Sequence, residues 1–200
     1  MLNIKPLKLS GNWAEGFALD IHTLSSEFLG YDDFDHPVFS TKYTEIGEVL
    51  YRLKSKSDKS VISEILDTAS SFLKDTWKIA GELNFIIPVP PSNTARKFQP
   101  VVELAKGLGG RLTIPVVMDA LRKIKKTPQL KGVVDYSERM RILQGAFTVT
   151  ESLTRGKRIL LFDDLYRSGA TLGIITQTLM EQGKTDRVYV LCLTKTRSKS

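Results

Sequence analysis

The sequence predicts an α/β fold in which helices flank a parallel sheet, with a smaller accessory lobe at the N-terminus. Short apolar segments alternate with helical segments over residues 85–193, as expected for parallel strands joined by helices. Two of these segments, 159–162 and 188–193, are continuously apolar and suit strands buried on both faces. Residues 1–84 lack this alternation. We therefore predict an N-terminal accessory lobe with two helices at 1–84 and a core at 85–200.

Composition limits the class of protein. The chain has 200 residues, of which 42% are hydrophobic and 26% charged, ordinary values for a soluble globular domain. Its net charge of +7 favours anionic partners such as a phosphorylated metabolite, a nucleic acid or a membrane surface. The single cysteine, Cys192, excludes a disulfide within the chain. We see no signal-peptide pattern and no apolar run long enough to span a bilayer, and we expect a cytoplasmic protein with no membrane partner.

The N-terminal lobe is predicted to contain two strands and two helices. Residues 2–9 alternate apolar and polar, as an edge strand does, and residues 18–26 suggest another short strand. Apolar residues at helical spacing predict a helix over 44–54, and a second helix capped by Asp58 runs to about Trp77. Three lysines near the end of the first helix are expected to lie in a solvated turn: Lys54, Lys56 and Lys59.

The core begins with a buried strand that runs from Phe85 into the rigid loop 88–91. A helix is predicted over 95–108, where Gly107, Gly109 and Gly110 are expected to end it. Residues 112–117 suggest a second extended segment, and 137–144 a short capped helix. Because ligands of parallel sheets bind beyond the carboxyl ends of the strands, we expect the loops after Phe85–Ile87 and Ile159–Phe162 to meet.

The candidate binding residues cluster where the predicted strand 159–162 ends. Asp163 and Asp164 follow it directly, and the small residues Ser168–Thr171 then open a helix. A strand, a short loop and a helix N-terminus form a phosphate-binding geometry, since the loop amides and the helix dipole favour an anion. Paired carboxylates accept hydrogen bonds from vicinal hydroxyls. The alternative is a surface turn in which Asp163 caps its own backbone.

This stretch resembles the phosphoribosyl pyrophosphate signature of the type I phosphoribosyltransferases, an apolar run followed by two acids and a Thr-Thr-Gly-Gly/Ala-Thr loop. The resemblance implies that Asp163 and Asp164 bind the ribose hydroxyls. Arg167 stands where the family has its first threonine. Tyr166 lies where an acceptor ring would stack, or it packs the loop. The resemblance assigns the 5-phosphate to Arg167, Ser168, Gly169, Ala170 and Thr171.

Residues from 85 onward further resemble the ComF-like branch of that family, with which DNA uptake is associated. The matching elements are Pro88–Pro90, Arg96–Gln99, Glu138–Arg139 and Gly145–Phe147. The N-terminal cysteine zinc module of many branch members is absent from this sequence. His22 and His36 form only a weak metal signal, and we assign no metal-ligating residue.

The resemblance implies two more parts of a site. A loop that grips pyrophosphate would comprise Val89, Pro90, Pro91 and Ser92. A mobile basic loop, about 122–131, would close over the site, or else remain a solvated loop. Its cations would neutralise the departing pyrophosphate: Arg122, Lys123, Lys125 and Lys126. Arg139 would bind a phosphate, or pair with Glu138 or Asp135. Magnesium is the implied cofactor, because it chelates pyrophosphate with few protein ligands.

Two functions follow. The first is a phosphoribosyltransferase that uses phosphoribosyl pyrophosphate and magnesium to ribosylate a nitrogen base or amide. The second is an inactive protein that binds phosphoribosyl pyrophosphate or a nucleotide, or serves as a DNA-uptake accessory. Basic residues do not interleave with aromatic ones as a single-strand platform requires, so nucleic-acid binding is the weaker expectation. The resemblance is compatible with a homodimer, and the acceptor stays open.

Overall fold

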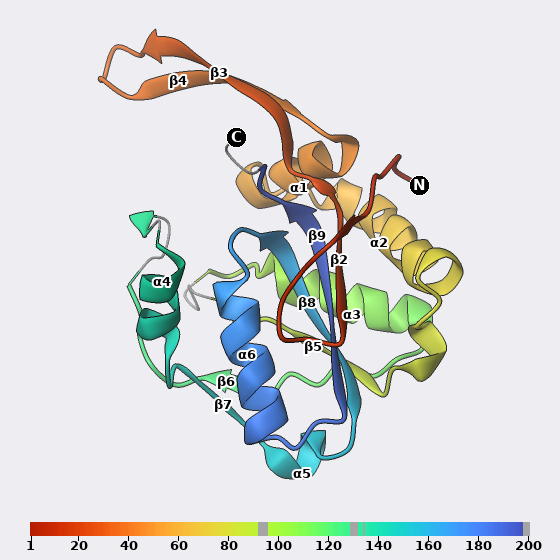
Figure 1. Ribbon diagram of the computed structural model, residues 1–200. Helices are drawn as coiled ribbons and strands as arrows, with labels where there is room; N and C mark the ends of the chain where they lie inside the picture. The colour runs from red at the N-terminus through yellow and green to blue at the C-terminus, as the bar shows by residue number, and fades with distance from the viewer. Residues whose placement is uncertain (92–95, 129–131, 134, 198–200) are drawn as a thin grey trace.

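The structure is a computed structural model that describes residues 1–91, 96–128, 132–133 and 135–197. At its centre lies a five-stranded sheet (Figure 1). In spatial order its strands are β1 (Leu7–Lys8), β2 (Glu15–Ile21), β9 (Arg187–Lys195), β8 (Arg158–Tyr166) and β5 (Phe85–Pro88). Neighbouring strands are parallel except β1, which runs antiparallel to β2. The predicted fold class, a parallel sheet flanked by helices, is confirmed.

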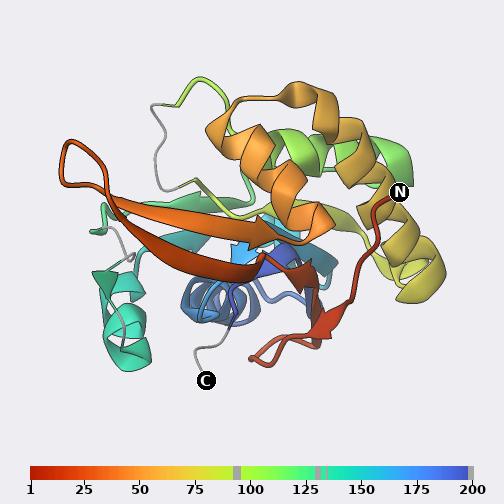
Figure 2. The same ribbon diagram turned by 90° about the horizontal axis from the view of Figure 1, so that it is seen from above.

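Helices cover both faces of the sheet, as the view from above shows (Figure 2). One face carries α1 (Glu45–Ser55), α2 (Ile62–Ser71) and α3 (Pro100–Leu112), and the other carries α6 (Ala170–Glu181). Along β8 successive side chains point to opposite faces. Leu160 and Phe162 therefore join the core under α1–α3, whereas Ile159 and Leu161 join the core under α6.

The remaining helical segments are short. A 3₁₀ turn at Lys59–Val61 leads into α2, a π-helical turn at Phe72–Thr76 extends it, and another 3₁₀ turn lies at Ala80–Glu82. The two α-helices not yet named are α4 (Tyr136–Leu143) and α5 (Glu151–Thr154).

The two predicted N-terminal helices form where expected. Thr44 caps α1, because its hydroxyl accepts a hydrogen bond from the Gly47 amide at 3.1 Å. Asp58 caps the following turn, where its carboxylate accepts from the Ser60 amide at 3.0 Å. Their buried stripes supply much of the core on this face, with Leu50 and Leu53 almost fully buried.

The helix predicted at 95–108 lies further along the chain, at α3, and its glycines do not end it. A Cβ on Gly107 would lie 2.3 Å from Leu66 Cδ1, so this glycine permits close packing of α3 on α2. A Cβ on Gly109 would lie 2.7 Å from the carbonyl oxygen of Ile114. The helix ends instead at Thr113, which adopts the left-handed conformation with φ 57°.

Residues 112–117 form no strand of the sheet. Val116 makes one isolated parallel bridge to Ile86, and the amide of Ile86 donates to the Pro115 carbonyl at 2.9 Å. The segment thus runs beside β5 at the edge of the sheet.

The N-terminal region contributes strands to the central sheet. The predicted edge strand 2–9 is reduced to β1, and the strand predicted at 18–26 is divided between β2 and β3 (Thr23–Tyr31). The division into residues 1–84 and 85–200 stays a prediction, but the sheet draws strands from both ranges.

Two small sheets complete the fold. β3 pairs with β4 (Pro37–Tyr43) in a hairpin that projects from the body of the molecule (Figure 1). β6 (Leu121–Lys123) pairs with β7 (Phe147–Val149). Across the described residues, every helix is too short or too polar to cross a lipid bilayer.

Candidate functional site at the carboxyl end of β8

The two adjacent acids lie within β8, which continues to Tyr166 rather than ending at Phe162. Asp163 pairs in register with Cys192 of β9, and Tyr166 pairs with Lys195. Because side chains alternate along a strand, the two carboxylates leave the sheet on opposite faces. Asp164 follows Phe162 toward α1, and Asp163 follows Leu161 toward α6.

Asp164 forms an ion pair with Lys54 of α1. The distance from Lys54 Nζ to Asp164 Oδ2 is 2.7 Å, and the two side chains are only 33% and 13% exposed. This pair joins the N-terminal helix to the acid motif across more than a hundred residues of sequence.

Asp163 has a different environment. Its Oδ1 accepts a hydrogen bond from the Asp164 amide at 2.9 Å. The Asp163 residue is half-buried. Burial raises the pKa of its carboxyl to about 8, and the charge of Asp164 adds to this rise, while Lys54 opposes it. Near neutral pH the protein therefore favours a protonated Asp163.

The turn after β8 depends on Gly169. This residue is the N-cap of α6 and adopts φ 80°, a left-handed conformation that glycine tolerates. A Cβ here would lie 2.7 Å from Tyr166 Oη. The Tyr166 ring meets Trp13 edge-on, with centroids 6.4 Å apart, so Tyr166 packs the loop. Gly169 supplies no side-chain acceptor to the first turn of α6, and the Ala170 amide donates to Ser168 Oγ at 3.5 Å. A helix N-terminus of this kind attracts anions.

Arg139 reaches this turn from α4. The residue is only 8% exposed, and its guanidinium donates to Ser168 Oγ at 3.0 Å and to the Val133 carbonyl at 2.6 Å. Its side chain thus faces the loop rather than Glu138 or Asp135. A buried guanidinium beside a helix N-terminus creates a strongly positive position.

The other predicted cations do not meet at this turn. Arg122 and Lys123 belong to β6 and not to a loop, because both pair with residues of β7. Lys123 Nζ donates to Thr127 Oγ1 at 2.7 Å, and burial lowers the pKa of Lys123. Lys125 and Lys126 follow β6 and are exposed. Residues 129–131 of the predicted mobile loop lie outside the described residues.

The predicted pyrophosphate loop begins beside the acid motif. β5 ends at Pro88, which is paired with Phe162, and the Val89 amide donates to the Phe162 carbonyl at 2.9 Å. Pro90 and Pro91 follow and are half-buried. Ser92 lies outside the described residues. The predicted pyrophosphate loop thus starts, at Val89, beside the residue that precedes the acid pair, and its meeting with the loop after β8 stays a prediction.

Comparison with solved structures identifies the fold. Over 95% of this chain and 74% of the other, the structure superposes on adenine phosphoribosyltransferase from Trypanosoma brucei, determined with AMP, pyrophosphate and ribose-5-phosphate, with a TM-score of 0.50 and 13% identity. The chain has the fold of the type I phosphoribosyltransferases. No family model and no curated protein matches the sequence.

Two further phosphoribosyltransferase structures are similar to a lesser degree. The adenine enzyme from Saccharomyces cerevisiae matches with a TM-score of 0.46 and 12% identity over 85% of both chains. Orotate phosphoribosyltransferase from Aeropyrum pernix matches with a TM-score of 0.41 and 19% identity over 78% of this chain and 68% of its own.

Sequence reasoning missed Lys54 and His22 at this edge of the sheet. Lys54 was expected in a solvated turn but pairs with Asp164. His22 Nδ1 lies 3.2 Å from Thr194 Oγ1 of β9. Burial lowers the pKa of His22, and the charge of Lys54 lowers it further, while Asp164 opposes the change. No local pattern predicts these contacts, because each one joins distant parts of the chain.

The side chains near the acid pair can be compared with those that a magnesium ion requires. Within the residues that the structure describes, three or more His, Cys, Asp or Glu side chains do not gather as a metal cluster. Two adjacent carboxylates, one of them ion-paired, are too few to hold magnesium by themselves. They suit an ion that arrives already chelated by a substrate.

Proposed function

We propose that this protein binds phosphoribosyl pyrophosphate with magnesium at the β8–α6 turn and transfers the 5-phosphoribosyl group to a nitrogen base or amide, releasing pyrophosphate. One observation carries the proposal. An acid pair lies near the carboxyl end of β8, and a glycine turn at the start of α6 follows the strand, with the buried Arg139 donating to Ser168 in that turn.

The 5-phosphate would bind at the turn. Backbone amides at the start of α6 and the hydroxyls of Ser168 and Thr171 supply hydrogen-bond donors, and the helix dipole favours the negative charge. Arg139 adds a charge-assisted donor next to Ser168, at a position where water screens it little. Arg167 is exposed and would add charge at the rim of the site.

The ribose hydroxyls would bind at the acid pair. A protonated Asp163 can donate a hydrogen bond to one hydroxyl oxygen, while the ionised Asp164 accepts one from the other hydroxyl. The two groups lie on opposite faces of β8, so each would contact one hydroxyl of a diol placed over the end of the strand. Its negative charge also stabilises the positive charge that develops on the ribose ring in the transition state.

In the transfer step, the bond from C1 of ribose to the pyrophosphate oxygen breaks as a bond from the acceptor nitrogen to C1 forms. The pyrophosphate leaves with the electron pair, and the acceptor nitrogen gives up a proton. Magnesium, bound through the pyrophosphate, would neutralise the charge on this leaving group. The exposed Lys125 and Lys126 would contribute to the same charge balance.

Calorimetry with phosphoribosyl pyrophosphate and magnesium tests the binding step. We expect binding to the unaltered protein and at least a tenfold loss in Asp163→Asn/Asp164→Asn. Asp186→Asn is the matched control, because Asp186 is exposed just before β9, at the opposite end of the sheet. Equal affinity in the double variant and the control would remove the proposed ribose site. Pyrophosphate release with a panel of bases and amides then tests turnover.

One observation favours a second function, binding without transfer. The ion pair with Lys54 occupies the carboxylate of Asp164, so a ribose must share or displace this contact. A protein that senses phosphoribosyl pyrophosphate or a nucleotide needs no more than such binding. Tight binding with no pyrophosphate release across the panel would support this function, and salt-dependent DNA binding would support a DNA-uptake role.

A further inference from the structure

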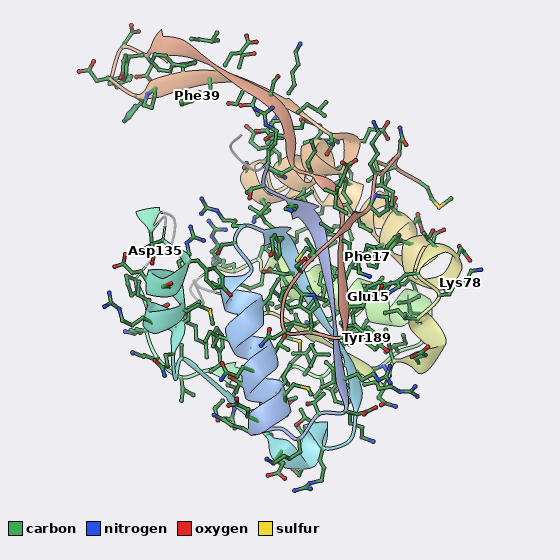
Figure 3. The ribbon with its side chains drawn as sticks, in the orientation of Figure 1. Glu15, Phe17, Phe39, Lys78, Asp135 and Tyr189 are labelled. Atoms are coloured by element: carbon green, nitrogen blue, oxygen red, sulfur yellow. The ribbon has the colours of Figure 1, made fainter. Side chains whose placement is uncertain are left out.

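His22 lies at the carboxyl end of β2, between that strand and the hairpin Thr23–Tyr43, which we call the arm. Glu15 and Phe17, which Figure 3 labels, lie toward the opposite end of β2. The His22 amide donates to the Lys195 carbonyl at 2.7 Å, so its backbone is tied to the end of β9. Because β2, β9 and β8 run parallel, His22 belongs to the edge of the sheet that carries the acid pair.

Hydrogen bonds connect the His22 ring to the acid pair. His22 Nδ1 lies 3.2 Å from Thr194 Oγ1, and the Thr194 hydroxyl donates to the carbonyl oxygen of Asp164 at 3.2 Å. The ring also meets Tyr43 edge-on, with centroids 5.5 Å apart, which restrains its orientation. Two hydrogen bonds thus separate the imidazole from the residue that is proposed to bind a ribose hydroxyl.

This hydrogen-bond chain assigns the proton of the neutral His22 ring to Nδ1. A hydroxyl has one proton to donate, and a carbonyl oxygen can only accept. The Thr194 proton therefore points to Asp164, and Thr194 Oγ1 accepts a hydrogen bond from Nδ1–H of His22. Since a neutral imidazole has a single N–H, Nε2 carries the lone pair. The residue is half-buried, which leaves part of it accessible to a ligand.

We propose that His22 Nε2 accepts the proton that the acceptor nitrogen releases in the transfer step. The acceptor nitrogen bonds to C1 of ribose as pyrophosphate leaves with the electron pair of the C1–O bond. The N–H bond then breaks, its electrons stay on the nitrogen, and its proton moves to Nε2. The imidazolium afterwards releases this proton to water. The inference rests on the proposed transfer, for which it names the group that takes the proton.

The position of His22 suits this role. C1 of ribose is bonded to the carbon that carries one of the two vicinal hydroxyls. A ribose held by Asp163 and Asp164 therefore places C1 at the same edge of the sheet as His22. Thr194 would act as a positioning residue, because its hydroxyl holds Nδ1–H and so directs the lone pair of Nε2 away from β9.

The charge state of His22 suits the role as well. Lys54 of α1, Asp164 of β8 and Tyr43 of β4 face His22 from the surrounding elements. Burial lowers the pKa of His22 below its ordinary value of 6.5, and the charge of Lys54 lowers it further, while Asp164 opposes the change. The unprotonated ring therefore predominates near neutral pH, as a general base requires.

Neighbouring titratable groups are less suited to take the proton. The raised pKa of Asp163 favours its protonated form near neutral pH, and the carboxylate of Asp164 is engaged by Lys54. Burial raises the pKa of Tyr43, so its phenol keeps its proton. His22 instead combines an available lone pair with an uncharged ring.

Nitrogen-15 NMR of the full-length protein tests the geometry without any substrate. Above the pKa of His22 we expect a proton on Nδ1 and the chemical shift of an unprotonated nitrogen for Nε2. Thr194→Val should lose this preference, because valine has a similar shape but accepts no hydrogen bond. His36, exposed near the tip of the arm, is the reference. A ring protonated at Nε2 in the unaltered protein would overturn the proposal.

The pH dependence of pyrophosphate release tests the role in transfer, with adenine, orotate and glutamine among the bases and amides offered as acceptors. We expect kcat of His22→Gln to fall about a hundredfold, with an unchanged affinity for phosphoribosyl pyrophosphate by calorimetry. In the unaltered protein kcat/KM should rise with pH, and the midpoint should match the pKa of His22 in an NMR titration. This rise should be absent from His22→Gln. His36→Gln is the matched control and should behave like the unaltered protein.

The outcomes separate this inference from the proposed function. Full activity and an unchanged pH profile in His22→Gln would exclude His22 as the proton acceptor and leave the transfer intact. A fall in affinity for phosphoribosyl pyrophosphate as large as the fall in kcat would make His22 a binding residue and also overturn the inference. If the unaltered protein released no pyrophosphate with any acceptor, the proposed transfer and this role would both be wrong.

Discussion

The two faces of the central sheet place neighbouring, chemically identical residues in different environments. On the face under α1–α3, Asp164 meets a cation, because Lys54 Nζ lies 2.7 Å away. On the face under α6, Asp163 lies beside the apolar core that includes Leu161 and Cys192, and its pKa is raised. Alternation along β8 places the two carboxyl groups on these different faces.

The comparison shows how one strand can supply two kinds of hydrogen-bonding group from one residue type. A nearby cation favours the charged form of a carboxyl group, and burial favours the protonated form. In a ribose site the first acts as an acceptor and the second as a donor. The difference depends on α1, a helix outside the predicted core.

The largest effect should come from removing each acid in turn. Asp164→Asn leaves the Lys54 ammonium partly buried without its partner, and we expect the free energy of unfolding to fall by about 2 kcal/mol. Asp163→Asn removes a carboxyl whose ionisation the fold disfavours, so stability above pH 8 should be unchanged or higher. Urea denaturation of both variants measures the difference. Equal losses would mean that the two faces do not differ as described.

The next effect concerns the turn on the α6 face. Gly169→Ala introduces a Cβ 2.7 Å from Tyr166 Oη at a φ of 80°, and we expect a loss of about 2 kcal/mol in the free energy of unfolding. Gly156→Ala is the control, because Gly156 has a φ of 68° but open space around it. It should lose less. A loss as large in the control would show that backbone strain, and not Tyr166, requires glycine in the turn.

The pH dependence of stability should separate the faces further. The pKa of Asp163 is raised in the folded state, so its contribution to stability is complete below the ordinary value of 3.8 and is lost as pH rises to about 8. The unfolding free energy of the unaltered protein should fall relative to Asp163→Asn across this range. Denaturation at a series of pH values measures it. A constant difference from pH 4 to 8 would contradict the raised pKa.

The smallest expected effect is a change in the pKa of His22, caused by nearby charges. Because the charge of Lys54 lowers the pKa of His22 and that of Asp164 raises it, Lys54→Met should raise this pKa and Asp164→Asn should lower it. The chain has only two histidines, and His36, near the tip of the arm, serves as the reference in the same NMR titration. A shift of both histidines together would indicate a change in overall charge instead.

Several elements followed directly from local sequence. The apolar run Ile159–Phe162 predicted a buried strand, the stripe and cap of residues 44–54 predicted α1, and the acids with the small residues after them predicted the turn before α6. Each depends on hydrophobic periodicity or on side chains within a few positions of one another. Predictions of local structure failed where contacts with residues distant in the sequence determine the conformation. The glycines of α3 looked like a helix stop but permit its close approach to Leu66 and to the Ile114 carbonyl.

The sequence by itself determined the fold class and the position of the acid-turn-helix motif, because both arise from local patterns of apolar, acidic and small residues. Only the tertiary structure decided which partners this motif has. Lys54, His22 and Arg139 reach it from distant segments, and the energy of an ion pair or a buried guanidinium depends on distance and exposure, which no local pattern contains.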